Sequence, residues 1–209
     1  MKTKTKVLAL FLSAVLLVVT TVFTTMAFLT STTETVENTF TVGRVKITLD
    51  EADVDEYGNL LDADGNVWEA DKILANRVTG NMYKLIPGHK YVKDPTIHVS
   101  SDSEDCWLFV KVENGLKSIT ASATIEEQMQ NTYDWKCIDE TNNIWAYENK
   151  ASKNDNVQVF SNFTIMGTAD VSQYASAKIV ITAYAIQADG FDTPEKAWEV
   201  AGTEAQNKQ

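Results

Sequence analysis

The most constraining feature of this sequence is a series of short apolar or alternating runs, which are typical of β-strands. The strongest run, residues 106–112 (CWLFVKV), is apolar enough to be buried on both faces near its start. Residues 178–187 form a longer run in which apolar side chains occupy both alternating faces. Turn-forming residues separate such runs at short intervals, and helical patterns are few. We therefore predict an all-β fold, a β-sandwich with one or two short helices.

Weaker patterns predict the remaining strands. Residues 45–49 alternate after a bend at Gly43 and are predicted to be the first strand of the sandwich. Residues 50–71 are acidic and rich in turn residues, and we predict a hairpin around Asp64 and Gly65. The other predicted strands are residues 91–100, which must accommodate Pro95, residues 135–138 and 144–147, which form a hairpin through residues 139–143, and residues 157–165.

Two segments have helical patterns. Residues 119–130 place Ile125 and Met129 four positions apart, with polar residues between them. The other helix is predicted to begin after Thr193, which can cap it, with Pro194 in the first helical position. We find no internal repeat of fixed period.

The N-terminus has the composition of an export leader. Lysines alternate along residues 2–6, residues 7–23 are almost wholly apolar, and small residues follow. We predict a signal helix that is cleaved between Ala27 and Phe28, and an uncleaved membrane anchor is the alternative. In both cases the rest of the chain lies outside the cell, because the lysines stay inside. The predicted localisation is secreted, in the extracellular matrix or at the cell surface, and the membrane is contacted only through the leader before cleavage.

These patterns divide the chain of 209 residues into four segments. Residues 1–27 are the signal peptide, residues 28–43 an N-terminal β-prone segment, residues 44–203 the sandwich domain and residues 204–209 a flexible tail. A hydrophobic content of 44% is enough for one ordinary core.

Charge and cysteine content restrict the partners and the cross-links. The net charge is −11 and no basic cluster is visible, so nucleic acid is not a predicted partner. Cys106 and Cys137 can form a disulfide in an exported chain. The alternative is that they are two small core residues that never meet, and the sequence does not decide between the two.

No catalytic or cofactor site is predicted. The only histidines, His89 and His98, are nine positions apart and lack the spacing of a zinc site, so we interpret them as surface residues. The sequence also has no nucleophile elbow and no glycine-rich phosphate loop. Asp53, Asp55 and Asp64 are weak calcium candidates, because their loop matches some positions of an EF-hand loop and departs from it at others.

The order of several motifs resembles the TasA/camelysin family of Gram-positive bacteria, whose members are exported through a dedicated signal peptidase. The first motif is the leader followed by residues 38–47 (NTFTVGRVKI). The others are Pro87-Gly88 with residues 93–95 (KDP) and 110–112 (VKV), and residues 183–188 (AYAIQA) with Phe191 and residues 197–198 (AW). The resemblance implies a jelly-roll sandwich and a biofilm-matrix fibre subunit. It also implies that the processed N-terminus is a donor strand, with Phe28, Leu29, Val36, Phe40 and Val42 as its apolar residues.

The leading hypothesis is therefore a secreted structural protein, not an enzyme, that assembles head to tail by donor-strand addition. Its partners would be further copies of itself, a related accessory or anchor subunit, and the signal peptidase. The alternatives are a secreted camelysin-type metallo-endopeptidase and a non-polymerising cell-surface adhesion or anchoring module. The sequence leaves open whether the chain is a main or an accessory fibre subunit.

Overall fold

The computed structural model describes residues 44–207, which belong to one compact unit that spans Gly43–Gln209. The predictions for the leader, for cleavage between Ala27 and Phe28 and for the donor residues lie outside the described residues. The strands are β1 (Ile47–Asp50), β2 (Lys90–Val92), β3 (Thr96–Val99), β4 (Cys106–Asn114), β5 (Trp135–Asp139), β6 (Ile144–Tyr147), β7 (Asn156–Gln158), β8 (Asn162–Thr164) and β9 (Ile179–Gln187). The helices are α2 (Ile125–Thr132) and α3 (Pro194–Asn207), with short 3-10 turns η1 (Lys117–Ile119) and η2 (Val171–Tyr174). The described chain is mostly β, with two helices, as predicted.

The larger sheet has the order β5-β6-β4-β9 and is antiparallel throughout. Strands β4 and β9 pair along their whole length, from Cys106 opposite Gln187 to Asn114 opposite Ile179. These are the two strands with the clearest apolar patterns in the sequence, and both predictions are confirmed. The predicted hairpin between residues 135–138 and 144–147 is also confirmed as β5 and β6.

The second layer consists of a three-stranded sheet, β1-β3-β7, and a two-stranded sheet, β2-β8. The prediction of single strands at residues 91–100 and 157–165 is wrong, because each segment contributes one strand to each sheet. The change of sheet occurs at Pro95, which has no backbone N–H to give to a ladder and directly precedes β3. The break is bridged by hydrogen bonds from Val159 N to Pro95 O, 2.8 Å, and from Lys93 N to Ser161 O, 3.1 Å.

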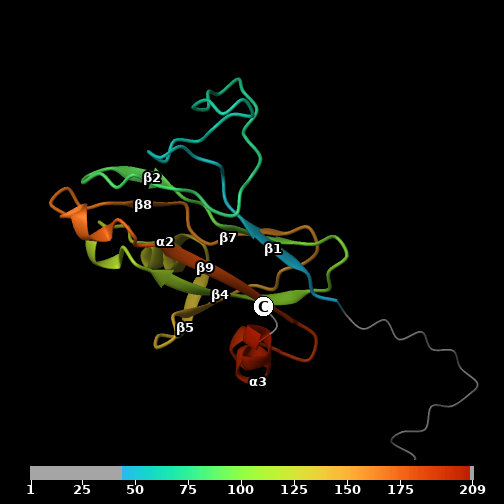
Figure 1. The fold of residues 1–209 in the computed structure, drawn as a ribbon. Coiled ribbons are helices and arrows are strands. Elements are labelled where there is room, and N and C mark those ends of the chain that lie inside the picture. Colours follow the sequence, from blue (N-terminus) through green and yellow to red (C-terminus); the bar gives the residue numbers. More distant parts are fainter. Residues whose placement is uncertain (1–43, 208–209) are drawn as a thin grey trace, which may run out of the picture. The chain divides into compact units, whose positions relative to one another are not determined.

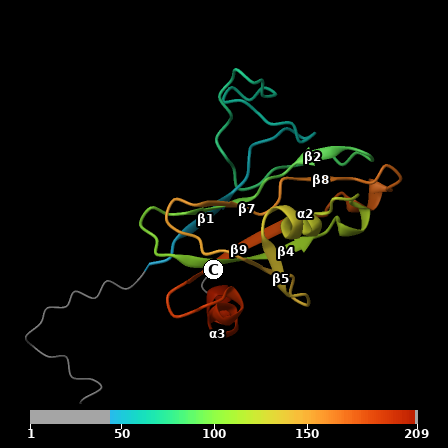
Figure 2. The same cartoon turned by 180° about the vertical axis from the view of Figure 1, so that it is seen from behind.

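The main core lies between the two layers (Figures 1 and 2). Alternate residues of β4 enter it, including Leu108 and Val110, and Tyr91 and Ile97 face them from the second layer. All four side chains are fully buried. Residues of α2 close one side of this core, and Thr124 forms a reciprocal capping box with Glu127 there. The helix therefore begins at Ile125, later than the predicted start at residue 119.

Helix α3 covers the other face of the larger sheet (Figure 1). The Trp198 ring lies 4.8 Å from Phe109 and 5.7 Å from Tyr184, measured between ring centroids. The predicted start of this helix at Pro194 is confirmed. Residues 204–207 of the predicted flexible tail continue α3, and Ala205 packs against this second core.

Residues 51–89 form an arm that connects β1 to β2 and projects from the sandwich (Figures 1 and 2). The arm contains a tandem repeat that we did not predict from the sequence, Asp-x-x-Gly-Asn at residues 55–59 and again at residues 62–66. In each copy the aspartate Oδ1 accepts from two backbone N–H groups, at 2.8 Å and 2.9 Å. The predicted hairpin around Asp64 and Gly65 is confirmed by the bridge between Leu61 and Val67.

The two repeat glycines provide a matched test of packing in the arm. Both have positive φ, +75° at Gly58 and +82° at Gly65, so alanine is strained at either position. A Cβ at Gly58 would lie 2.8 Å from Tyr91 Cα, whereas a Cβ at Gly65 would meet no atom within 4 Å. In urea denaturation we expect Gly65→Ala to lower the free energy of unfolding by about 1 kcal/mol and Gly58→Ala by about 3 kcal/mol. Equal losses would contradict the close packing of the first turn on β2.

Candidate functional site

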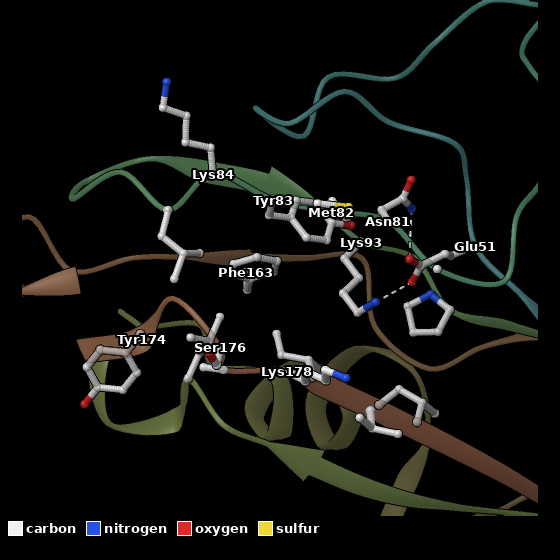
Figure 3. A pocket seen from close by; sticks show the side chains of 18 of the residues that line it. Glu51, Asn81, Met82, Tyr83, Lys84, Lys93, Phe163, Tyr174, Ser176 and Lys178 are labelled. Atoms are coloured by element: carbon white, nitrogen blue, oxygen red, sulfur yellow. Dashed lines mark hydrogen bonds and ion pairs between the residues drawn. The ribbon is translucent and has the colours of Figure 1, made fainter. Parts of the chain in front are cut away.

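A groove of about 900 Å³ opens between the two layers (Figure 3). Tyr83 and Phe163 form part of one wall, and the residues that lead from η2 into β9 form the other. The remaining apolar lining includes Leu49, Leu85, Leu116, Val171, Ile179 and Ile181. The groove is therefore lined by both apolar and polar residues and is open to solvent.

The groove runs beside β9. The order of the described strands ends at β9, whose inner edge is paired with β4. Lys178 O accepts from Gly115 N at 2.9 Å, and Ala188 N donates to Asp105 O at 2.8 Å. The backbone N–H and C=O groups of the even-numbered residues of β9 therefore face β4. In an antiparallel strand the backbone groups of the residues between them, such as Ile179 and Ile181, point to the opposite edge.

The wall opposite β9 is held rigidly by aromatic contacts. Phe163 lies 4.9 Å from Tyr91 in a stacked arrangement and 5.4 Å from Tyr83 in an edge-on arrangement. The Tyr83 hydroxyl donates to Val92 O at 3.0 Å. Burial of the ring, together with the nearby Glu51 carboxylate, raises the pKa of Tyr83 well above its ordinary value, so the hydroxyl stays protonated. This wall is thus preformed.

A polar cluster interrupts the apolar lining at one end of the groove (Figure 3). Lys93 Nζ lies 2.5 Å from Glu51 Oε2, and the two side chains are only 10% and 5% exposed. Asn81 Nδ2 donates to Glu51 Oε1 at 2.8 Å, and Asn81 Oδ1 accepts from Val54 N. Figure 3 shows Tyr174 toward the other end. We call Glu51, Asn81 and Lys93 the polar cluster.

The groove can accept an extended peptide. An extended segment placed in the groove would bring alternate side chains to its core side.

The cysteines do not meet. Strand β6 lies between β4, which holds Cys106, and β5, which holds Cys137. A separation of two strands is about 10 Å, which exceeds the reach of a disulfide. Both cysteines are free, so the disulfide interpretation is wrong and the alternative of two separate residues is correct. Burial raises the pKa of Cys106 to about 11, which makes the thiol a poor nucleophile.

The histidines have separate structural contacts. His89 Nε2 lies 2.8 Å from Tyr57 O in the arm. His98 lies on β3, where Nε2 is 2.8 Å from Asp50 Oδ1 on β1 and Nδ1 contacts Asn156 on β7. Within residues 44–207, no three histidine, cysteine or acidic side chains are grouped as a metal site requires.

The calcium candidates serve other contacts. The Asp55 carboxylate accepts from Tyr57 N and Asn59 N and closes its own turn. Asp64 belongs to the second turn, where its N–H donates to Asp62. The hydrogen bond from Asn66 N is the main cause that lowers the pKa of Asp62. Asp53 is half-buried next to the first hairpin, and its carbonyl accepts from Leu61 N.

Arg77 attaches the arm to the three-stranded sheet. Its Nε lies 2.5 Å from Asp50 Oδ1 and its Nη1 lies 2.9 Å from Asp94 Oδ2. Burial tends to raise the pKa of Asp50, but the hydrogen bonds and charges of Arg77 and His98 outweigh it, so the pKa is lowered. Asp50 therefore stabilises the fold above its ordinary pKa, and this contribution is lost as the pH falls through its lower folded value.

We expect Asp50→Asn to lower the free energy of unfolding by about 1 kcal/mol at neutral pH. The difference from the parent protein should disappear below the folded pKa of Asp50, because the parent carboxylate is then also neutral. Thermal unfolding between pH 2 and pH 7 measures this. Glu113→Gln is the control, since that side chain is 55% exposed and pairs only with Lys111, and should change stability little. A difference for Asp50→Asn that does not change with pH would contradict the assignment.

Comparison with family models, with curated proteins and with solved structures found no match to this chain. Among residues 44–207, no helix is both long enough and apolar enough to span a bilayer.

Proposed function

We propose that this chain is a secreted structural subunit of extracellular, biofilm-matrix fibres. In this proposal the processed N-terminal segment of one copy, residues 28–43, adds as a strand to the groove of the next copy. The observation that supports the proposal is the groove that opens between the two layers beside β9.

The sequence of the N-terminal segment suits this groove. Val36, Phe40 and Val42 share one parity, with threonines on the other parity at residues 39 and 41. A strand of this pattern presents apolar side chains to one face and polar side chains to the other. Addition of the segment of one copy to the groove of another leaves the second copy's own segment available, so the contact repeats without closing and produces a fibre.

The finer parts of the proposal rest on the resemblance to the TasA/camelysin family. They are the jelly-roll arrangement of the two layers, export with cleavage between Ala27 and Phe28 by a dedicated signal peptidase, and an accessory or anchor subunit as a further partner. The antiparallel layers around one core are compatible with such a fold.

A non-polymerising cell-surface adhesion or anchoring module is the second candidate. The projecting arm favours it, because Val67, Ile73 and Leu74 are 54%, 81% and 49% exposed there. No contact in residues 44–207 favours the metallo-endopeptidase alternative, since His89 and His98 contact different groups.

The proposal is tested by purifying the chain that begins at Phe28 and following light scattering and electron micrographs with time. We expect scattering to rise with protein concentration and fibres to form. A chain that remains monomeric at high concentration after removal of the leader would favour the adhesion module instead.

A further inference from the structure

We propose that the side chains of Lys93 and Asn81 form an intramolecular isopeptide bond, with Glu51 as the acid–base group of the reaction. The bond joins Nζ of Lys93 to Cγ of Asn81 and releases ammonia. The polar cluster fills the three roles that this reaction requires, which are a nucleophile, a polarised amide and a group that moves protons between them. Fibre assembly is not required for it.

Glu51 is placed to take a proton from Lys93. Its Oε2 lies 2.5 Å from Lys93 Nζ, and the two side chains are only 5% and 10% exposed. An ammonium nitrogen has no free electron pair, so it becomes a nucleophile only after it gives up a proton. The Tyr83 ring lies 5.9 Å from Nζ. Burial of this kind favours neutral groups over charged ones, and transfer of one proton to Glu51 produces a neutral amine and a neutral carboxylic acid.

The Asn81 side chain is held as a polarised amide. Its Oδ1 accepts from Val54 N at 3.1 Å, and Val54 is buried. When an amine adds to an amide carbon, negative charge develops on the oxygen, and a fixed backbone N–H group stabilises that charge. The Val54 N–H group is therefore placed as an oxyanion donor.

Glu51 also contacts the leaving group. Asn81 Nδ2 donates to Glu51 Oε1 at 2.8 Å and to Ala52 O at 2.9 Å. One carboxylate thus contacts both the attacking and the leaving nitrogen (Figure 3) and can carry protons from the first to the second. Lys93 ends on a flexible four-carbon stem, so Nζ can move from Oε2 to Cγ while Asn81 keeps its hydrogen bonds.

The reaction balances without an oxidant, a cofactor or water. Lys93 gives one proton to Glu51, and the electron pair of its neutral nitrogen forms a bond to Asn81 Cγ. Glu51 then donates its proton to Nδ2, and the bond between Cγ and Nδ2 breaks to release ammonia. Glu51 takes a second proton from the new amide nitrogen, and transfer of that proton to ammonia restores the carboxylate.

The bond would close a ring of residues 81–93, which contains Tyr83 and Tyr91. The rings of these tyrosines lie 5.6 Å apart, measured between centroids, and belong to the aromatic contacts that hold one wall of the groove. A covalent link that closes a ring restricts the unfolded chain and stabilises the folded one. Both cysteines are free, so the isopeptide bond would supply a staple that they do not.

The intact mass of the folded chain that begins at Phe28 tests the proposal. We expect incubation of the folded protein to lower its mass by one ammonia, whereas the chain held unfolded in urea should keep the mass of its sequence. Tryptic digestion should release a branched peptide that joins the segment with Asn81 to the segment with Lys93, because trypsin does not cleave after a modified lysine.

Two variants of the polar cluster should lose the bond. Glu51→Gln removes the proton carrier and should slow bond formation at least about 100-fold. Lys93→Arg keeps the positive charge but replaces the amine with a guanidinium that stays protonated, and it should form no bond. Lys84→Arg is the matched control, because Lys84 lines the same groove but is exposed, and it should react like the parent chain. Circular dichroism checks that each variant is folded, and Lys93→Arg keeps the test valid if Glu51→Gln does not fold.

A second control concerns Asn114. A cyclic imide at an Asn-Gly pair also releases ammonia, and Asn114-Gly115 is the one such pair in the sequence. Asn114→Gln should therefore leave the loss of mass and the branched peptide unchanged.

A folded parent chain that keeps its full mass, or a loss of mass that disappears in Asn114→Gln, would overturn the proposed bond. Equal rates of bond formation in the parent chain and in Glu51→Gln would overturn the role of Glu51. Each of these results leaves the fibre function standing, because that function is tested by light scattering and electron micrographs of the same chain.

Discussion

Removal of residues 28–42 from the processed chain should abolish fibre growth and leave a folded, monomeric domain. The domain should remain folded because residues within the described range form two hydrophobic cores. Growth should stop because the truncated chain can accept a strand but has none to donate. Sedimentation and circular dichroism of the truncated chain measure the two effects separately.

The truncated chain should also act as a terminator. Added to growing fibres of the processed chain, it would occupy an available donor segment and offer none to the next copy. We expect growth to slow at substoichiometric amounts, whereas the same amount of an unrelated acidic protein should have no effect. Fibres of the truncated chain alone would show that assembly uses another surface, such as the arm.

A charge placed in the groove should block assembly without unfolding the monomer. Ile181 lies on the core side of β9 and lines the groove, where its side chain is half-buried. In the monomer a glutamate there can still reach water through the open side of the groove. A strand that covers it would bury an unpaired carboxylate, at a cost of about 3 kcal/mol, so we expect growth of Ile181→Glu fibres to be at least about 100-fold weaker.

Thr182→Glu is the matched control, because Thr182 is the next residue of β9 and its side chain has the opposite parity. It lies opposite Lys111 of β4, which can pair with the new carboxylate. This variant should assemble like the parent chain. Equal loss of assembly in both variants would mean that charge on β9 matters generally and that the groove has no special role.

The elements that could be predicted from the sequence are those whose patterns are local. Strand β4 is apolar on both faces because one face meets the second layer and the other meets α3, and its sequence already contains both sets of side chains. The β5–β6 hairpin follows from a turn at residues 139–143, where Asp139 accepts from two backbone N–H groups. The start of α3 follows from its proline.

The elements that could not be predicted depend on contacts between distant residues. In the sequence, Pro95 fits either an edge strand or the start of a strand. The pairing of β2 with β8 and of β3 with β7 shows that Pro95 directly precedes the start of β3. The separation of Cys106 from Cys137 depends on the insertion of β6 between their strands. The tandem turns of the arm correspond to Asp-x-x-Gly-Asn repeated seven residues apart, a local signal that was present in the sequence but was not predicted.

The groove could not be predicted from the sequence either, because it depends on contacts between distant residues. Its walls come from β1, the arm, β8 and β9, which are far apart in the chain. Lys93 and Glu51 resemble ordinary surface charges in the sequence, and only their pairing across 42 positions shows them to be buried partners. One local signal existed, since Lys93 has the same parity as the fully buried Tyr91.

The most direct measurement of the central claim is the structure of the assembled fibre by electron cryomicroscopy. The account predicts that residues 28–42 of the neighbouring subunit lie in the groove as an additional strand. An empty groove, or a groove filled by the subunit's own N-terminal segment, would contradict it.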